Sequence, residues 1–223
     1  MKPHLFEDPI LFWIGTFPVT ETMCNSTIVT LVVASFAALM GILVKRAPQN
    51  WLSGLAMWIV ETLDEQVKQI VGHADQAVST LAGALFLFIA GCNLAGQLPG
   101  VQPATANLTT SSALAAIVFF AVPIAGIRAH GVWKYVKHYF QPNPLLMPLH
   151  LLSEVSRTLA LSIRLFGNVL SGHLIVAILV SLAGILVPTP LMALDLLIGL
   201  LQAYIFAVLA TVYIGAAVSA GED

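Results

Sequence analysis

The chain has 223 residues, of which 58% are hydrophobic and only 9% are charged, and its formal net charge is −2. Soluble domains carry about 25% charged residues, so this composition excludes a soluble domain and predicts an all-α polytopic membrane protein. The chain has no basic arm and no interleaved aromatic and basic residues, which argues against a nucleic-acid partner. The two cysteines, Cys24 and Cys92, lie far apart within or beside apolar segments, and we interpret both as small buried hydrophobic residues.

Residues 1–21 precede the first long apolar stretch. They contain one lysine, followed by Glu7, Asp8 and Pro9, and lack the basic start, apolar core and cleavage pattern of a signal peptide. We therefore expect this part to be retained as a segment outside the membrane.

Five later stretches are long and apolar enough to form membrane-spanning helices, which need about 20 residues each. They lie at residues 22–44, 78–98, 108–127, 146–187 and 191–219. Residues 50–72 differ: Asn50 can cap a helix whose apolar residues recur at helical spacing and whose polar residues crowd the second half. This pattern predicts an amphipathic helix lying in the interface, with an ordinary amphipathic packing helix as the alternative. No internal repeat is evident, so residues 1–223 are expected to form a single membrane domain.

Basic residues predict the orientation of this layout. One side carries Lys45, Arg46, Lys68, Arg128, Lys134 and Lys137, whereas the other side has only Lys2. Cytoplasmic loops carry an excess of lysine and arginine, so we expect the N-terminus outside and the C-terminus in the cytoplasm.

Arg164 is the most informative single residue. It lies in a run, residues 159–187, that is otherwise apolar or small and has only His173 as a second ionisable group. Arginine does not lose its proton in proteins, and an arginine at membrane depth costs roughly 2.5–3.5 kcal/mol even on the most lenient scale. This cost indicates that the protein uses a fixed positive charge inside the bilayer.

The small and polar residues around Arg164 share one stripe of a helix that turns by about 100° per residue. They are Ser153, Arg157, Ala160, Arg164, Asn168 and Ser171. Lipid does not tolerate such a stripe, so we expect it to face protein or water. His173 lies about 180° around the helix from Arg164 and about 13.5 Å further along, so it belongs to a different compartment.

The last apolar segment carries a matching stripe, formed by Asp195, Gly199, Gln202, Phe206 and Tyr213. If the last two segments form an antiparallel hairpin, Arg164 comes level with Gln202, and His173 with Asp195. A histidine beside a carboxylate can relay protons near neutral pH.

Purely structural roles remain open for these residues. Arg157 could snorkel or pair with Glu154, and Asp195 could complement the helix dipole. His173 and Gln202 could be ordinary core or interhelical polar residues.

Three motifs carry a family resemblance. Residues 156–168, SRTLALSIRLFGN, resemble the signature of subunit a of the rotary F-type ATP synthase, and residues 201–209 and 107–110 are similar to two further motifs of that family. Two departures are visible. Bacterial members often have glutamate at position 173 and histidine at position 195, and this chain exchanges them, which supports their acting as a pair. Thr158 stands where the family usually has proline.

The resemblance implies a fold, partners and roles. The fold would be five membrane-embedded helices plus one interfacial helix, with the last two forming a long tilted hairpin against a rotor ring. The partners would be a c-ring of small hairpin subunits carrying the ion-binding carboxylate, b-type peripheral stalk subunits and the lipid bilayer of the bacterial inner membrane. The nucleotide chemistry would lie on other subunits, without a cofactor or metal in this one.

By the same resemblance, Arg164 matches the stator arginine, and the other ion-translocation positions are Asn168, His173, Asp195 and Gln202. The candidates for a cytoplasmic half-channel are His150, Ser153, Glu154 and Arg157. The coupling ion, proton or sodium, stays open.

Three other functional classes fit the sequence less well, and one of them, a purely structural membrane scaffold, would not explain Arg164. A self-contained secondary transporter or ion channel is expected to show internal repeats or its own paired acid, and neither is evident. An intramembrane hydrolase would need a motif such as HExxH or GxSxG, which the sequence lacks.

Overall fold

The structure is a computed structural model that describes residues 10–14, 17–46, 49–72, 75–97, 103–139, 147–184 and 189–219. Several predictions from the sequence fall outside the described residues. These are Lys2, residues 1–9 and 15–16 of the expected outer segment, and residues 98, 146 and 185–187 at the ends of expected helices.

Within the described residues, five helices are long and apolar enough to cross a membrane. They are α1 (Glu21–Arg46), α3 (Gln76–Gly96), α4 (Leu108–His130), α6 (Met147–Ala183) and α7 (Thr189–Ser219). The all-α membrane fold expected from the sequence is therefore present. A helix suits these segments because it satisfies every interior backbone group without water.

Local sequence signals set several helix ends. The side chains of Asp75 and Asn107 accept hydrogen bonds from the backbone N–H groups of Ala77 and Thr109, which caps α3 and α4. Helix α2 (Trp51–Val71) begins after Asn50 as predicted, but the Asn50 side chain makes no capping hydrogen bond. Instead, the Asn50 carbonyl accepts from the N–H of Gly54, so only its backbone takes part in the first turn.

Helix α2 buries one face inside the bundle. Its residues Val67 and Val71 join a buried cluster with Ala82 of α3 and Ile214 of α7. The tryptophans at the start and middle of α2 stay exposed. The helix thus combines a packing face with an outward face of the kind that lies at headgroup level.

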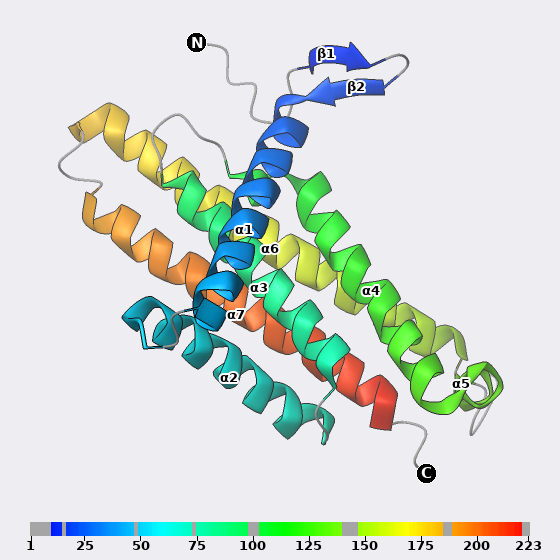
Figure 1. Cartoon of the computed structure of the whole chain (residues 1–223). Coiled ribbons are helices and arrows are strands. Elements are labelled where there is room, and N and C mark those ends of the chain that lie inside the picture. Colours follow the sequence, from blue (N-terminus) through cyan, green and yellow to red (C-terminus); the bar gives the residue numbers. More distant parts are fainter. Residues whose placement is uncertain are drawn as a thin grey trace.

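Several short elements were not expected from the sequence. Strands β1 (Ile10–Ile14) and β2 (Phe17–Thr20) form a small antiparallel sheet before α1 (Figure 1). A short helix, α5 (Val132–Tyr139), follows α4, and a single 3₁₀ turn, η1 (Ala104–Ala106), precedes α4. Tyr135 of α5 is buried and lies directly over Gly126 of α4, so α5 folds back on α4.

Helices α6 and α7 run in opposite directions and are joined at one end, the yellow and orange-to-red helices of Figure 1. They share a core with α3 and α4, in which Leu161 and Leu165 of α6 meet Ala203 and Phe206 of α7. Helix α7 packs more extensively against α3 than against α6. Helix α3 therefore joins the hairpin mainly through α7, while α6 packs mainly on α4.

Candidate functional site

Arg164 points away from the bundle. The buried apolar residues of this part of α6 are Leu161, Leu165 and Val169, which recur every fourth position and set the face that packs on α4 and α7. Arg164 lies off that face and is exposed. Among the described residues, it has no hydrogen-bond or ion-pair partner.

The polar stripe predicted on α6 is largely an outer surface of the described bundle. Its members Ser153, Arg157, Ala160 and Ser171 are exposed like Arg164, and Asn168 is half-buried. A charged and polar stripe on a membrane-spanning helix needs a protein or water neighbour, because lipid cannot satisfy it. The stripe therefore marks the side of the subunit where another molecule or water must lie.

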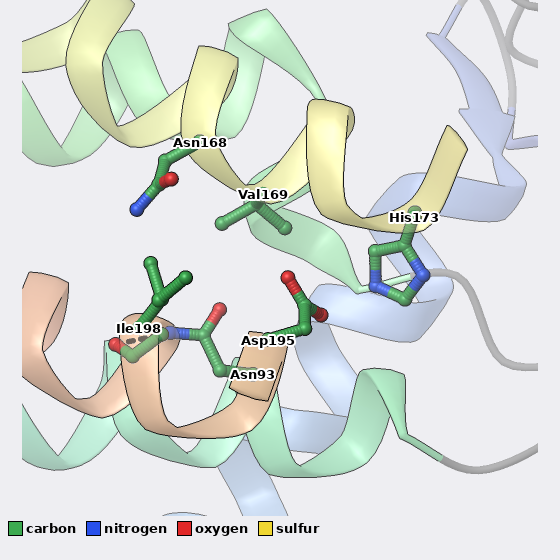
Figure 2. A pocket seen from close by; sticks show the side chains of 7 residues that line it. Asn93, Asn168, Val169, His173, Asp195 and Ile198 are labelled. Atoms are coloured by element: carbon green, nitrogen blue, oxygen red, sulfur yellow. Dashed lines mark hydrogen bonds between the residues drawn. The ribbon is translucent and has the colours of Figure 1, made fainter. Parts of the chain in front are cut away.

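A small polar hollow, which we call the Asp195 hollow, lies between three helices. It is lined by Asn93 of α3, by Asn168, Val169 and His173 of α6, and by Asp195, Ile198 and Gly199 of α7. Figure 2 shows the Asp195 carboxylate directed from α7 toward α6, beside the His173 ring. The structure thus brings His173 and Asp195 together at one level of the hairpin, as the register argument predicts.

The same register argument places Arg164 level with Gln202, but the two side chains do not contact each other. Gln202 is turned into the bundle with only 5% of its surface exposed, whereas Arg164 is turned out. The Gln202 side-chain nitrogen has no hydrogen-bond partner among the described residues. The two residues thus point to different sides of the hairpin.

Glycines allow the polar side chains of the Asp195 hollow to press against neighbouring helices. A Cβ on Gly172 of α6 would lie 1.8 Å from Oδ1 of Asp195, and a Cβ on Gly96 of α3 would lie 2.9 Å from Nε2 of His173. Neither position has room for a side chain. Small residues at helix interfaces permit such close approach in membranes.

The sequence analysis missed two residues of this site, Asn93 on α3 and Gln97 directly after its end. Asn93 donates from Nδ2 to the carbonyl oxygen of Gly199 over 2.8 Å, and Gln97 donates from Nε2 to Oδ2 of Asp195 over 3.2 Å. The signal was available, because two amides four positions apart share one face of a helix and are unusual in an apolar span. Two isolated amides are nevertheless a weaker signal than the charged and polar stripes of the last two segments.

A second small hollow, the Arg157 hollow, lies further toward the start of α6. Its lining comprises Glu154, Arg157, Thr158 and Leu161 of α6, Val118, Phe119 and Val122 of α4, and Tyr213 of α7. The Arg157 guanidinium lies 4.6 Å from the centre of the Tyr213 ring, a cation–π arrangement.

Of the four residues expected for the cytoplasmic path, Glu154 and Arg157 line the Arg157 hollow. His150 and Ser153 are exposed and are not part of its lining. Thr158, which replaces the family's usual proline, donates from its hydroxyl to the carbonyl oxygen of Glu154, and α6 continues through it as a helix.

Arg164 lies between the two hollows along α6. At 1.5 Å per residue, it is about 10.5 Å beyond Arg157 and about 13.5 Å before His173. The Asp195 hollow has a volume of about 10 Å³ and the Arg157 hollow about 20 Å³, so each has room for roughly one water. Between them Leu165 is fully buried in the apolar core, so the two hollows are separated inside the subunit.

The family profile described as ATP synthase A chain matches residues 16–215 of this sequence. The chain belongs to this family. Among its relatives, ATP synthase subunit a 2 of Bradyrhizobium sp. (strain BTAi1 / ATCC BAA-1182) is 39% identical over 220 residues, which cover 98% of this chain and 97% of the relative. ATP synthase subunit a of Nitrosospira multiformis is 38% identical over 219 residues, which cover 97% of this chain and 87% of the relative.

Membership in the ATP synthase A chain family confirms the resemblance carried by the motifs. The chain is a non-catalytic, multi-pass membrane subunit of an ATP synthase, in the proton-conducting membrane sector of that complex. This finding decides against the self-contained transporter and the intramembrane hydrolase that were considered from the sequence.

Proposed function

We propose that this chain is the stator subunit that supplies two offset half-channels, with Arg164 as the fixed charge between them. The observation that carries the proposal is the placement of Arg164, which is exposed and unpartnered among the described residues and lies between two hollows that each contain ionisable side chains. The Asp195 hollow would be the outer half-channel and the Arg157 hollow the cytoplasmic one.

The charge that opposes Arg164 would arrive on another chain. A c-ring of small hairpin subunits, packed against the exposed stripe of α6, would carry a carboxylate past the guanidinium. A permanent cation favours the ionised form of a nearby carboxylate, so the ring site releases its ion there. After rotation, the site would be refilled from the other half-channel, and Arg164 would prevent direct leakage between the two.

His173 and Asp195 would pass protons along the outer path. A histidine and a carboxylate in one water-accessible hollow can exchange protons through water, which an apolar lining cannot do. Glu154 and Arg157 would serve the cytoplasmic path. Whether sodium replaces the proton is decided by comparing ATP-driven uptake with and without sodium.

The orientation follows from the charges at the helix ends, and the partners follow from the family. Lys45 and Arg46 end α1, and Arg128 ends α4. By the positive-inside rule, we infer that these ends face the cytoplasm and that the N-terminus lies outside, in the inner membrane of a bacterium. The b-type peripheral stalk would hold the subunit still against the turning ring.

Replacement of Arg164 tests this function. The Arg164→Ala complex is expected to assemble but to lose ATP-driven proton pumping, measured in inverted vesicles with a pH-sensitive dye. The matched control is Arg128→Ala, which removes another exposed arginine from a membrane helix and should pump normally. Full pumping by the Arg164→Ala complex would refute the proposal.

A further inference from the structure

Helix α3 contacts both members of the His173–Asp195 pair through two consecutive residues. Gln97 donates to Oδ2 of Asp195, and Gly96 provides the space into which Nε2 of His173 fits. Gln97 stands at the end of α3, where its backbone N–H bonds to the carbonyls of Leu94 and Ala95. The backbone from which the Gln97 amide reaches Asp195 is therefore fixed.

We propose that Gln97 is a positioning residue for ion transfer, and that it acts by holding the Asp195 carboxylate toward His173. The inference rests on the proposed role of Asp195 in the half-channel. A carboxylate has two acceptor oxygens and can turn about its side-chain bonds. With Oδ2 held from α3, Oδ1 is directed at α6, next to Gly172.

The chemistry of an amide suits this task. The Gln97 nitrogen donates hydrogen bonds but has no proton that it exchanges near neutral pH, so it can orient Asp195 without competing for the transferred proton. A lysine in its place would add a charge to the hollow. An apolar residue would leave the carboxylate with one fewer donor in a partly buried site, and such a loss is costly.

A second hydrogen bond keeps α3 and α7 in register for this contact. Asn93, one turn before Gln97, donates to the backbone carbonyl of Gly199, one turn after Asp195, and this bond is buried. The two amides thus link α3 to α7 at neighbouring levels. Asn93 fixes the backbones, and Gln97 reaches the side chain that is proposed to move protons.

The test is a double-mutant cycle on the intact ATP synthase in inverted vesicles, with pumping normalised to the amount of assembled subunit. Gln97→Leu is expected to lower ATP-driven proton pumping about tenfold in the wild-type background. In the Asp195→Asn background it should change pumping by less than about twofold, because its effect passes through the carboxylate. Gln76→Leu, which alters an exposed glutamine at the other end of α3, should be silent.

A second substitution covers the case in which Gln97→Leu does not assemble. Gln97→Glu keeps the size of the side chain, removes the amide donor and places a like charge beside Asp195. It should also lower pumping when the Asp195 carboxylate is present. In the Asp195→Asn background the loss should be much smaller, because the carboxylate that Gln97 positions is no longer there.

Two outcomes overturn the inference while leaving the proposed function standing: wild-type pumping by Gln97→Leu, or equal losses in both backgrounds. If Asp195→Asn itself pumps normally, the proposed role of Asp195 fails, and the inference fails with it. The single Asp195→Asn variant therefore separates the two kinds of failure.

Discussion

Gly172→Ala tests how closely α6 must approach Asp195. The added methyl carbon would lie 1.8 Å from Oδ1 of Asp195. Carbon and oxygen approach to about 3.3 Å even in weak hydrogen bonds, so the carboxylate must retreat by about 1.5 Å. Because the two oxygens belong to one rigid carboxylate, the movement also displaces Oδ2 from its position 3.2 Å from Nε2 of Gln97, and we expect this hydrogen bond to be lost. A hydrogen bond to a charged group is worth about 1.5 kcal/mol or more, which corresponds to about a tenfold loss of rate.

The assay is ATP-driven proton pumping by inverted vesicles that contain equal amounts of the assembled complex. The control is Gly83→Ala in α3, where the nearest atom to the new carbon is Cδ1 of Leu63 at 3.9 Å, an ordinary contact. Both changes replace glycine by alanine inside a membrane helix, so their helix propensities change equally. Pumping at the wild-type rate by the Gly172→Ala complex would show that the close approach of Asp195 to α6 does not matter for transport.

Two further predictions concern the other end of the bundle. Gly126→Ala would place a carbon against the ring of Tyr135, and such overpacking costs about 1–3 kcal/mol. It should lower the thermal unfolding midpoint of the detergent-solubilised subunit by several degrees. An unchanged midpoint would mean that α5 does not pack on α4 through Tyr135. Tyr213→Leu should reduce proton pumping severalfold by removing the ring beneath Arg157, whereas Tyr213→Phe, which keeps the ring, should stay near wild type. Equal losses in the two Tyr213 variants would contradict the cation–π role.

The sequence alone determined the class of fold and the residue on which the proposed function depends. Apolar stretches of membrane-spanning length can form only a few structures in lipid, so composition and length were enough to predict five long helices. Arg164 could be identified because a permanent charge in such a stretch is costly wherever the other helices lie. The helical period also placed His173 on the side opposite Arg164, because that depends on a single helix.

Helical period and register did not determine which residues touch. The level of Gln202 along α7 was compatible with a contact to Arg164, but packing against α3 turned Gln202 inward. Asn93 and Gln97 join the site because α3, an earlier segment of the chain, packs on α7 beside Asp195. The order of segments along the sequence does not state which helices become neighbours.

The sequence thus determined the helices, their apolar faces and the charge that lipid cannot accept, since these follow from the chain's own period and from the solvent. The tertiary structure alone decided the partners of Asp195, the separation of the two hollows by Leu165 and the exposure of the Arg164 stripe. These features depend on the rotation of each helix about its axis and on its distance from its neighbours. Both are set by how side chains of distant segments fit together, including the glycines that let Asp195 and His173 approach.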